Sequence, residues 1–523
     1  MIRNIFTVGG WTLVSRVTGF ARDIVMAAVL GAGPVADAFL VAFRLPNHFR
    51  AIFAEGAFAA AFVPAYARRL QQGGRGEAMR FADGIGTGLM LVLGAMLVLA
   101  LIFTPAVVRV LAPGLSADPA RFDLAVALTR ITFPYLALMS IETLIAGMLN
   151  ANHRFAAAAG APVLLNISMV GTLLLAAFFP TAGHAAAWGV LVAGILQALL
   201  VGADAERNGF GLRLRWPTFD APTVQFLKAL GPAIIGAGGV QLALFADTVI
   251  ATFLPTGALS ALYYADRINQ LPIGVVGIAV GIVLLPEMSR RLAAGDEAGA
   301  ASAQGRAIEL TLLIAIPFVA AAIAIPDLVM RALFARGAFT NADASAAAAT
   351  LTAYAFGLIP FMWMRSFTAP FLARGDTATP VKAALTAALV NILLKIALMG
   401  PLAQVGLALA TAVGAWLNWA LLVWFARSKG FERPDAPLAR GLYLVAIGLL
   451  LGVAFYAGQR FAGSALSGIP RFREEILLLV LLVAGTILYA ALVLALIGRN
   501  WLQTLLLDAG TRKPGADVTS YEI

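Results

Sequence analysis

Long apolar runs constrain this chain more than any other feature. Fourteen such stretches follow one another between short polar breaks, near residues 7–31, 35–64, 82–111, 124–150, 158–179, 184–203, 228–254, 260–288, 306–325, 345–372, 380–399, 403–426, 438–460 and 474–497. About 20 apolar residues in a helix span the hydrocarbon core of a bilayer. Runs of this length lack the alternation of a strand, and an open sheet would leave backbone groups unsatisfied in lipid. The pattern therefore predicts an all-α polytopic membrane protein with about 14 transmembrane helices.

The composition argues against a soluble enzyme. Of the 523 residues, 61% are hydrophobic and only 12% are charged, whereas soluble domains carry roughly 25% charged residues. The chain has no cysteine, which excludes disulfides, thiolate metal sites and thiol catalysis. No hydrolytic triad or metal cage is visible, so we expect neither catalysis nor a cofactor.

The distribution of Lys and Arg predicts the topology. Twenty-two of the 37 cationic residues fall in the termini and even-numbered connections, and eight fall in the odd-numbered connections. Cytoplasmic loops collect Lys and Arg, so both termini are expected to face the cytoplasm. Topology then accounts for the net charge of +10 without nucleic acid as a partner. The first run contains Arg16 and Arg22 and lacks a cleavage site, so it should remain as a span.

A weak internal repeat predicts two lobes. The sequence around Pro46 and Pro64 is echoed 226 and 222 residues later around Pro272 and Pro286. An offset of six helices preserves orientation, and repeats of this kind are typical of transporters, whose substrate site lies between the lobes. The predicted divisions are an N-lobe at 1–205, a basic interfacial linker at 206–228, a C-lobe at 229–430, two additional helices at 431–498 and a cytoplasmic tail at 499–523.

Charged residues within the predicted spans are the candidate substrate site. An ionised group at mid-bilayer costs roughly 2.5–3.5 kcal/mol even on a lenient scale, so these side chains should face the interior. They could be neutralised pairs that hold helices together, and for a single pair that alternative stays open. Arginine is nevertheless in surplus, and its planar fork binds phosphate bidentately, which predicts a water-filled cavity for an anionic guest. The candidates are Arg16, Arg22, Asp37, Arg44, Arg50, Glu55, Asp266, Arg267 and Arg365.

Helical spacing relates some of these charges to one another. Asp37, Arg44 and Glu55 are separated by 7 and 11 residues, which places them on one stripe of an ideal helix. Arg16 and Asp23 share a face of the first span, where Gly19 permits a break. We therefore expect Asp37 and Glu55 to pair with arginines when the cavity is empty.

Oxygen-bearing side chains offer a second, weaker site. Asp247, Asp376 and Asn391 carry oxygen ligands that could hold a coupling Na⁺ or a proton. Lys395 lies five residues before Gly400 and Pro401, and we expect it to snorkel to the outer membrane surface.

Five motifs carry a family resemblance. They are SRVTGFARD at 15–23, ADAF at 36–39, FRLPN at 43–47, IFAEGAF at 52–58 and YYADR at 263–267. With these motifs the chain closely resembles the MurJ (MviN) family of bacterial lipid II flippases, within the multidrug/oligosaccharidyl-lipid/polysaccharide exporter superfamily. The resemblance runs over essentially the whole chain and includes the layout of fourteen spans.

The resemblance implies alternating-access transport of lipid II, the undecaprenyl-pyrophosphate-linked peptidoglycan precursor, to the outer leaflet of the cytoplasmic membrane for cell wall synthesis. It implies that Arg16, Arg22, Asp37, Arg50 and Arg267 occupy cavity positions, that the last two spans form a groove for the polyprenyl tail, and that Asp247 and Asp376 lie near a sodium site. The protein is expected to act as a monomer among membrane lipids. Ala51 and Gln270 depart from the family pattern, and Arg44 and Arg365 are expected to compensate.

Two other functions remain open at this point. A flippase for another polyprenyl-diphosphate-linked glycan would need the same arginines. A cation-coupled drug exporter on the same scaffold should have an acidic and aromatic site, which the surplus of arginine disfavours.

Overall fold

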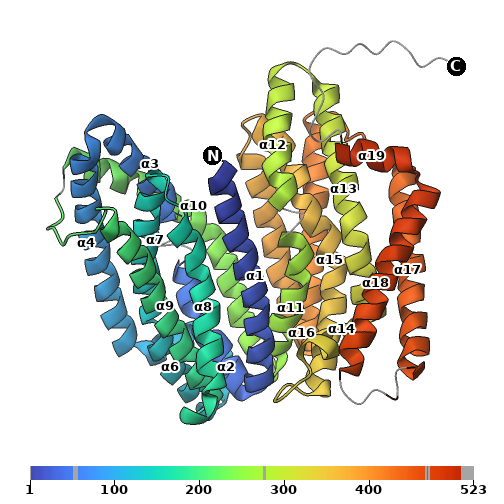
Figure 1. Ribbon diagram of the computed structural model, residues 1–523, viewed down its shortest axis with the longest axis horizontal. Coiled ribbons are helices and arrows are strands. Elements are labelled where there is room, and N and C mark those ends of the chain that lie inside the picture. The colour runs from blue at the N-terminus through green and yellow to red at the C-terminus, as the bar shows by residue number, and fades with distance from the viewer. Residues whose placement is uncertain are drawn as a thin grey trace. The chain divides into compact units, whose positions relative to one another are not determined.

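The computed structural model describes residues 2–50, 57–218, 220–274, 278–465, 468 and 472–507, and within these ranges it is helical without strands (Figure 1). The helices are α1 (Ile2–Leu30), α2 (Pro34–Arg50), α3 (Ala57–Gln72), α4 (Gly74–Ile102), α5 (Thr104–Leu111), α6 (Pro119–Thr132), α7 (Pro134–Ala151), α8 (Ala156–Leu174), α9 (Ala182–Arg207), α10 (Ala221–Thr252), α11 (Ala258–Pro272), α12 (Ile278–Ala293), α13 (Glu297–Ala324), α14 (Pro326–Phe334), α15 (Asn341–Ala373), α16 (Ala378–Ser428), α17 (Leu438–Ala465), α18 (Arg473–Leu496) and α19 (Arg499–Leu507), with short 3₁₀ turns at Pro113–Ala117 and Ala176–Phe178.

The predicted class, an all-α polytopic membrane protein, is confirmed. Every predicted span overlaps a helix, and nine helical stretches within the described residues are long and apolar enough to cross a bilayer. The predicted number of fourteen spans stays a prediction. Several runs expected as single spans are subdivided. For example, 124–150 is interrupted at Phe133 because Pro134 begins α7. Proline is favoured at the first position of a helix, since the amide hydrogen that it lacks would have no acceptor within the helix there.

Contacts divide the chain into two compact units. The N-terminal unit comprises Met1–Tyr264, Phe334–Ala346 and Lys395–Gln404. The C-terminal unit comprises Ala265–Leu333, Ala347–Leu394 and Val405–Ile523. The boundary at 264/265 falls inside α11, later than the predicted linker, and the predicted five-part division stays a prediction.

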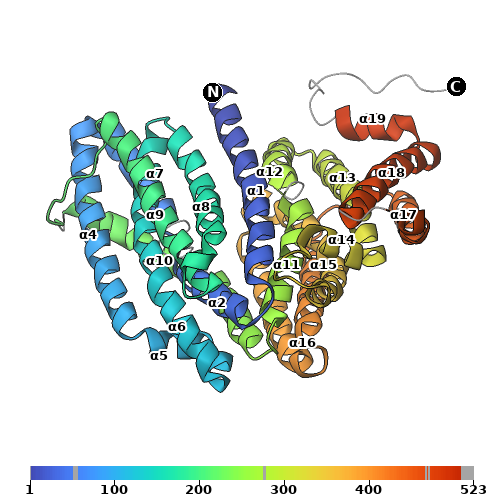
Figure 2. The ribbon, with the colours of Figure 1, turned by 60° about the horizontal axis from the view of Figure 1, so that its bottom comes forward.

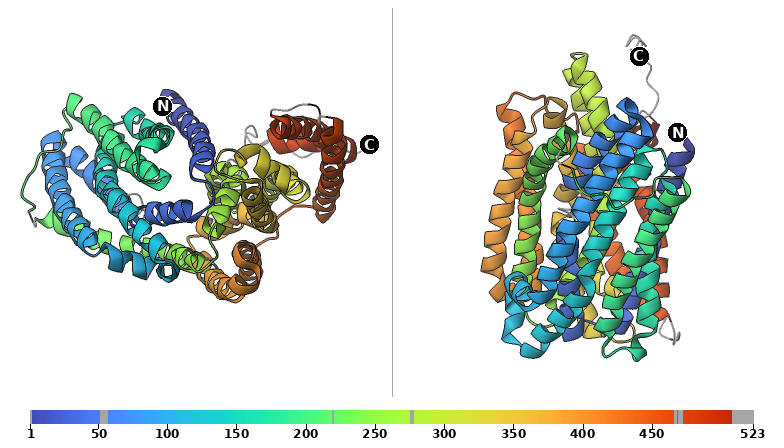
Figure 3. Two further views of the ribbon diagram at one scale, coloured as in Figure 1. Left: turned by 90° about the horizontal axis from the view of Figure 1, so that it is seen from below. Right: turned by 90° about the vertical axis from the view of Figure 1, so that its left-hand side faces the viewer.

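Helix α1 lies along α8 in the N-terminal unit (Figures 1 and 2). Small residues allow this close approach: Gly19 lies opposite the Asn166 amide, and Gly160 lies under the Trp11 ring. Gly19 permits a break, but α1 is continuous from Ile2 to Leu30. At this position glycine makes space for a neighbouring side chain. In the same unit α7 packs against both α4 and α9, and Figure 3 shows these helices from two further sides.

The basic connection after α9 is fastened to α4. The Asp83 carboxylate accepts the Arg213 backbone N–H at 2.9 Å, and the Thr87 hydroxyl accepts that of Arg215 at 3.0 Å. Leu212 and Pro217 contact the helix where Gly86 and Gly88 present no side chains. Trp216 remains 80% exposed, as expected for a residue anchored at the membrane interface.

The C-terminal unit holds its last helices against α13. Helix α17 packs on both α13 and α18, and the Tyr489 hydroxyl of α18 donates to the Leu313 carbonyl of α13 at 2.7 Å. Helix α19 runs crosswise to α17 and α18 (Figure 1). The buried Glu309 carboxylate joins these elements, because it accepts from Arg440 of α17 at 3.3 Å and from the Trp501 indole of α19 at 2.9 Å.

The Glu309→Ala substitution should weaken this junction. It removes the acceptor of two hydrogen bonds, one of them to a buried indole, so we expect the free energy of unfolding to fall by about 1–3 kcal/mol. Thermal unfolding of the purified protein in detergent measures the change. Glu432→Ala removes an exposed acid and is the matched control. Equal midpoints for the two variants would show that Glu309 does not hold α19.

Candidate functional site

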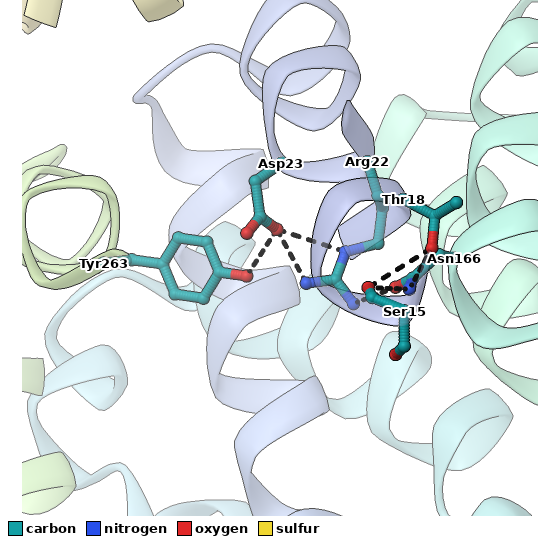
Figure 4. A network of polar contacts seen from close by, with 6 residues as sticks. All are labelled: Ser15, Thr18, Arg22, Asp23, Asn166 and Tyr263. Carbon is teal, nitrogen blue, oxygen red and sulfur yellow. Dashed lines mark hydrogen bonds and ion pairs between the residues drawn. The ribbon is translucent and has the colours of Figure 1, made fainter. Parts of the chain in front are cut away.

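Arg22 and Asp23 form the centre of a buried polar network on α1 (Figure 4). The Asp23 Oδ1 atom accepts from Arg22 Nε at 3.1 Å, from Arg22 Nη2 at 2.7 Å and from the Tyr263 hydroxyl at 3.0 Å. Arg22 Nη1 donates to Asn166 Oδ1 at 3.1 Å. With Arg22 only 7% and Asp23 only 3% exposed, each charge compensates the other away from water.

Asn166 fixes this network to α8. Its amide nitrogen donates to the Ser15 carbonyl and to the Thr18 hydroxyl, each at 3.0 Å (Figure 4). The amide oxygen is thereby turned toward Arg22, so the orientation of the guanidinium is set by a neighbouring helix. Arg16, six residues earlier on α1, is exposed, although it was expected to share a face with the buried Asp23.

Asp37 is fully buried in a second, separate network. Its Oδ2 accepts from Arg121 Nη2 at 3.1 Å and from the Gly257 amide at 2.8 Å. Its Oδ1 accepts from the Ser260 amide at 3.2 Å and from the Ser260 hydroxyl at 2.9 Å. The carboxylate thus faces the N-terminus of α11, where the helix dipole favours a negative charge, and it holds α2, α6 and α11 together.

The expected stripe on α2 is only partly described. Arg44 is half-buried, and among the described residues no hydrogen bond or ion pair is recorded for it. Asp37 pairs with Arg121 rather than with Arg44. The side chain of Arg50 and all of Glu55 lie outside the described residues, so their predicted roles stay predictions.

Three predicted site residues belong to the C-terminal unit. Asp266 accepts from Gln270 one turn later on α11. Arg267 is half-buried on the same helix. Arg365 of α15 is exposed, and the aliphatic stem of its side chain contacts α12 at Gly281, where a Cβ atom would lie 3.6 Å from the stem.

The predicted ion ligands do not form one site. In the N-terminal unit, the Asp247 carboxylate is bound at 2.5 Å by the Lys395 ammonium. Lys395 is only 3% exposed, so the expectation that it snorkels to the membrane surface is wrong. Its charge is neutralised inside the protein instead.

Asp376 and Asn391 cannot share an ion either. Asp376 caps the start of α16 by accepting from Thr379 and binds the Lys429 ammonium at 2.6 Å. Asn391 lies 13 residues after the first residue of α16, a rise of about 20 Å, and contacts Gly414. Nowhere in the described ranges do three His, Cys, Asp or Glu side chains gather as a metal site would require.

Sequence reasoning missed the partners of these acids. Arg121 falls between the predicted spans 82–111 and 124–150, yet it lies on α6 and is 9% exposed. Asn166 is a polar residue inside a predicted span, which was a usable signal. Tyr263 lies within one of the family motifs, but its bond to Asp23, 240 residues away in sequence, depends on the fold.

Sequence comparisons identify close relatives. The profile of a family described as "Lipid II flippase MurJ" matches residues 26–463. A probable lipid II flippase MurJ of Rhizobium tropici is 41% identical over 468 residues, which cover 88% of each chain. Another of Rhizobium meliloti (strain 1021) is 38% identical over 534 aligned positions, which cover 100% of this chain and 98% of the relative.

Solved structures share the fold. A structure described as "Lipid II flippase MurJ, inward closed conformation" aligns with a TM-score of 0.78 at 23% identity, covering 94% of this chain and 99% of that one. An inward-facing multidrug resistance transporter of the MATE family aligns with a TM-score of 0.66 at 14% identity, covering 79% and 94%.

The cap of α16 predicts a pH effect on stability. Hydrogen bonds from Lys429 and Thr379 hold the pKa of Asp376 well below its usual range. A carboxyl with a depressed pKa stabilises the fold fully above the unfolded value, near pH 4, and loses that contribution as pH falls toward the folded value. Urea unfolding at pH 7 and pH 3 should therefore show Asp376→Asn less stable than wild type at pH 7, with a smaller difference at pH 3. A difference that does not change with pH would contradict the assignment.

Proposed function

The chain belongs to the MurJ family of lipid II flippases, and from this membership we propose how its own residues serve the transport of lipid II. The match of the family profile to residues 26–463, with a relative aligned along the whole chain, is the observation that carries this function. The protein is a multi-pass membrane transporter. A flippase for another polyprenyl-linked glycan is not favoured, because the family profile and the relatives are described as lipid II flippases. A drug exporter is not favoured either, because the similarity to the MATE transporter concerns the fold alone.

The proposed cycle is alternating access. Lipid II is taken from the inner leaflet of the cytoplasmic membrane and delivered to the outer leaflet, by a monomer whose two termini face the cytoplasm. The excess of Lys and Arg in alternate connections supports this orientation.

Arginine side chains are proposed to hold the pyrophosphate. Arg16, Arg22, Arg50 and Arg267 are the principal ligands, with Arg44 and Arg365 as additional cations. The exposure of Arg16 and Arg365 supports their role, because an accessible guanidinium can exchange water for phosphate oxygens. Arg22 is held by Asp23 and Asn166, so its guanidinium has a fixed orientation.

Buried carboxylates are proposed to position helices rather than to contact the substrate. Asp37 already accepts four hydrogen bonds, including one from Arg121. Its negative charge is therefore compensated within the protein. The cation surplus that remains is what a diphosphate requires.

Helices α17 and α18 are proposed to accommodate the polyprenyl tail. Large apolar side chains such as Leu449, Val453 and Ile487 are exposed on them, which suits contact with a hydrocarbon chain. A cavity of about 540 Å³ near the ends of these helices is lined by Arg460 and Arg473. The apolar tail is therefore assigned to the outer faces of the helices and not to this charged cavity.

Substitution of the proposed ligands tests the assignment. In cells depleted of their own flippase, Arg16→Ala and Arg267→Ala should each lower the amount of lipid II reaching the outer leaflet about 10- to 100-fold, since a charge-assisted hydrogen bond contributes about 1.5–3 kcal/mol. Lysine at either position should retain intermediate transport, because it keeps the charge without the bidentate geometry.

The control is Arg207→Ala, which removes an exposed cation from the last turn of α9. All variants are compared at equal protein level in the membrane. Normal transport by both Arg16→Ala and Arg267→Ala would refute the proposed diphosphate site.

A further inference from the structure

A buried ion pair lies where an oxygen ligand for a coupling cation was expected. Lys395 Nζ of α16 is 2.5 Å from Asp247 Oδ1 of α10, and both residues belong to the N-terminal unit. The lysine side chain is 4% exposed, whereas that of the aspartate is 39% exposed. The ammonium is therefore the buried member of the pair, and the carboxylate is the accessible one.

Each charge depends on the other. Within the described part of the chain, the only polar partner recorded for Lys395 is Asp247, and the only one recorded for Asp247 is Lys395. A buried ammonium without its carboxylate would be strongly unfavourable in this apolar setting. Among the described residues, the pair is therefore held together by mutual neutralisation rather than by a wider hydrogen-bond network.

The donor set does not fit a sodium ion. A hard cation in a protein takes several oxygen ligands, but the nearest described partner of Asp247 is a positively charged nitrogen. Sodium bound to this carboxylate would have to displace the ammonium and leave it buried without a counter-charge. A lysine that belongs to the same unit also has a high effective concentration at Asp247, which a dissolved ion must exceed.

We infer that Lys395 is a tethered cation that occupies the cation position at Asp247, so that this chain has no sodium site there and requires no sodium at that carboxylate. The inference about binding stands on the ion pair alone. Its consequence for transport rests on the proposed function, because it says that sodium does not support lipid II translocation through Asp247.

Removal of the lysine should create the site that it fills. In Lys395→Ala, Asp247 loses its counter-charge and a cavity opens beside it, so the variant should unfold at a lower temperature than wild type and regain stability when sodium binds. Ligand binding to the folded state raises the midpoint with ligand concentration. In the double variant Lys395→Ala/Asp247→Asn, the charge is absent and sodium should have no effect.

The experiment measures thermal unfolding of the purified full chain in detergent, with NaCl exchanged for choline chloride at constant ionic strength and without lipid II. We expect a saturable rise of about 3 °C or more for Lys395→Ala and no sodium-specific rise for wild type or the double variant. Lys382→Ala, which removes an exposed lysine from the same helix, is the matched control and should behave as wild type.

Two results would overturn the inference. A saturable, sodium-specific rise in wild type would show that a free cation binds despite Lys395, and this arm needs no variant to fold. A Lys395→Ala protein that folds but gains nothing from sodium would show that the lysine serves packing alone. As a separate readout, wild-type translocation of lipid II in cells should be unchanged when NaCl is replaced by KCl, so failure of the transport proposal is distinguishable from failure of the cation inference.

Discussion

Compensation of charge inside an apolar helix bundle is the constraint on which the rest of this structure depends. An ionised side chain loses its hydration in the membrane, so it requires an opposite charge or several hydrogen bonds. Asp37 accepts hydrogen bonds from Arg121 and from the start of α11, and Asp23 accepts from Arg22 and Tyr263. Glu309 accepts from Arg440 and Trp501. Each carboxylate joins helices that are distant in sequence, and polar side chains therefore determine which helices meet.

The same constraint supports the proposal that exposed arginines hold the diphosphate of the substrate. Two carboxylates within the helices are engaged by partners inside their own unit, Asp37 by Arg121 and Asp247 by Lys395. Arginines such as Arg16 and Arg365 remain exposed. Lys395 supplies from within the chain the positive charge beside Asp247 that a dissolved cation would otherwise have to provide.

Much of the fold was predictable because its signals are local. An apolar run long enough to span a bilayer can satisfy its backbone only as a helix, and each predicted run overlaps one. Interruptions were harder to place. Pro134 begins a new helix and Ala403 adopts a left-handed backbone angle, φ 44°, inside α16, whereas Gly19 leaves α1 unbroken. A glycine or proline permits a break, but the packing of neighbouring helices decides whether the break occurs.

The sequence by itself determined the membrane class, the helical content, the family and the excess of arginine, since these follow from composition and short motifs. Tertiary structure alone decided the partners. Nothing near Asp37 predicts Arg121, which is 84 residues away, and nothing near Lys395 predicts Asp247, which is 148 residues away. Helical periodicity tells which side chains share a face, but a charge is neutralised by whichever residue a different helix brings within about 3 Å, and that depends on how whole helices pack.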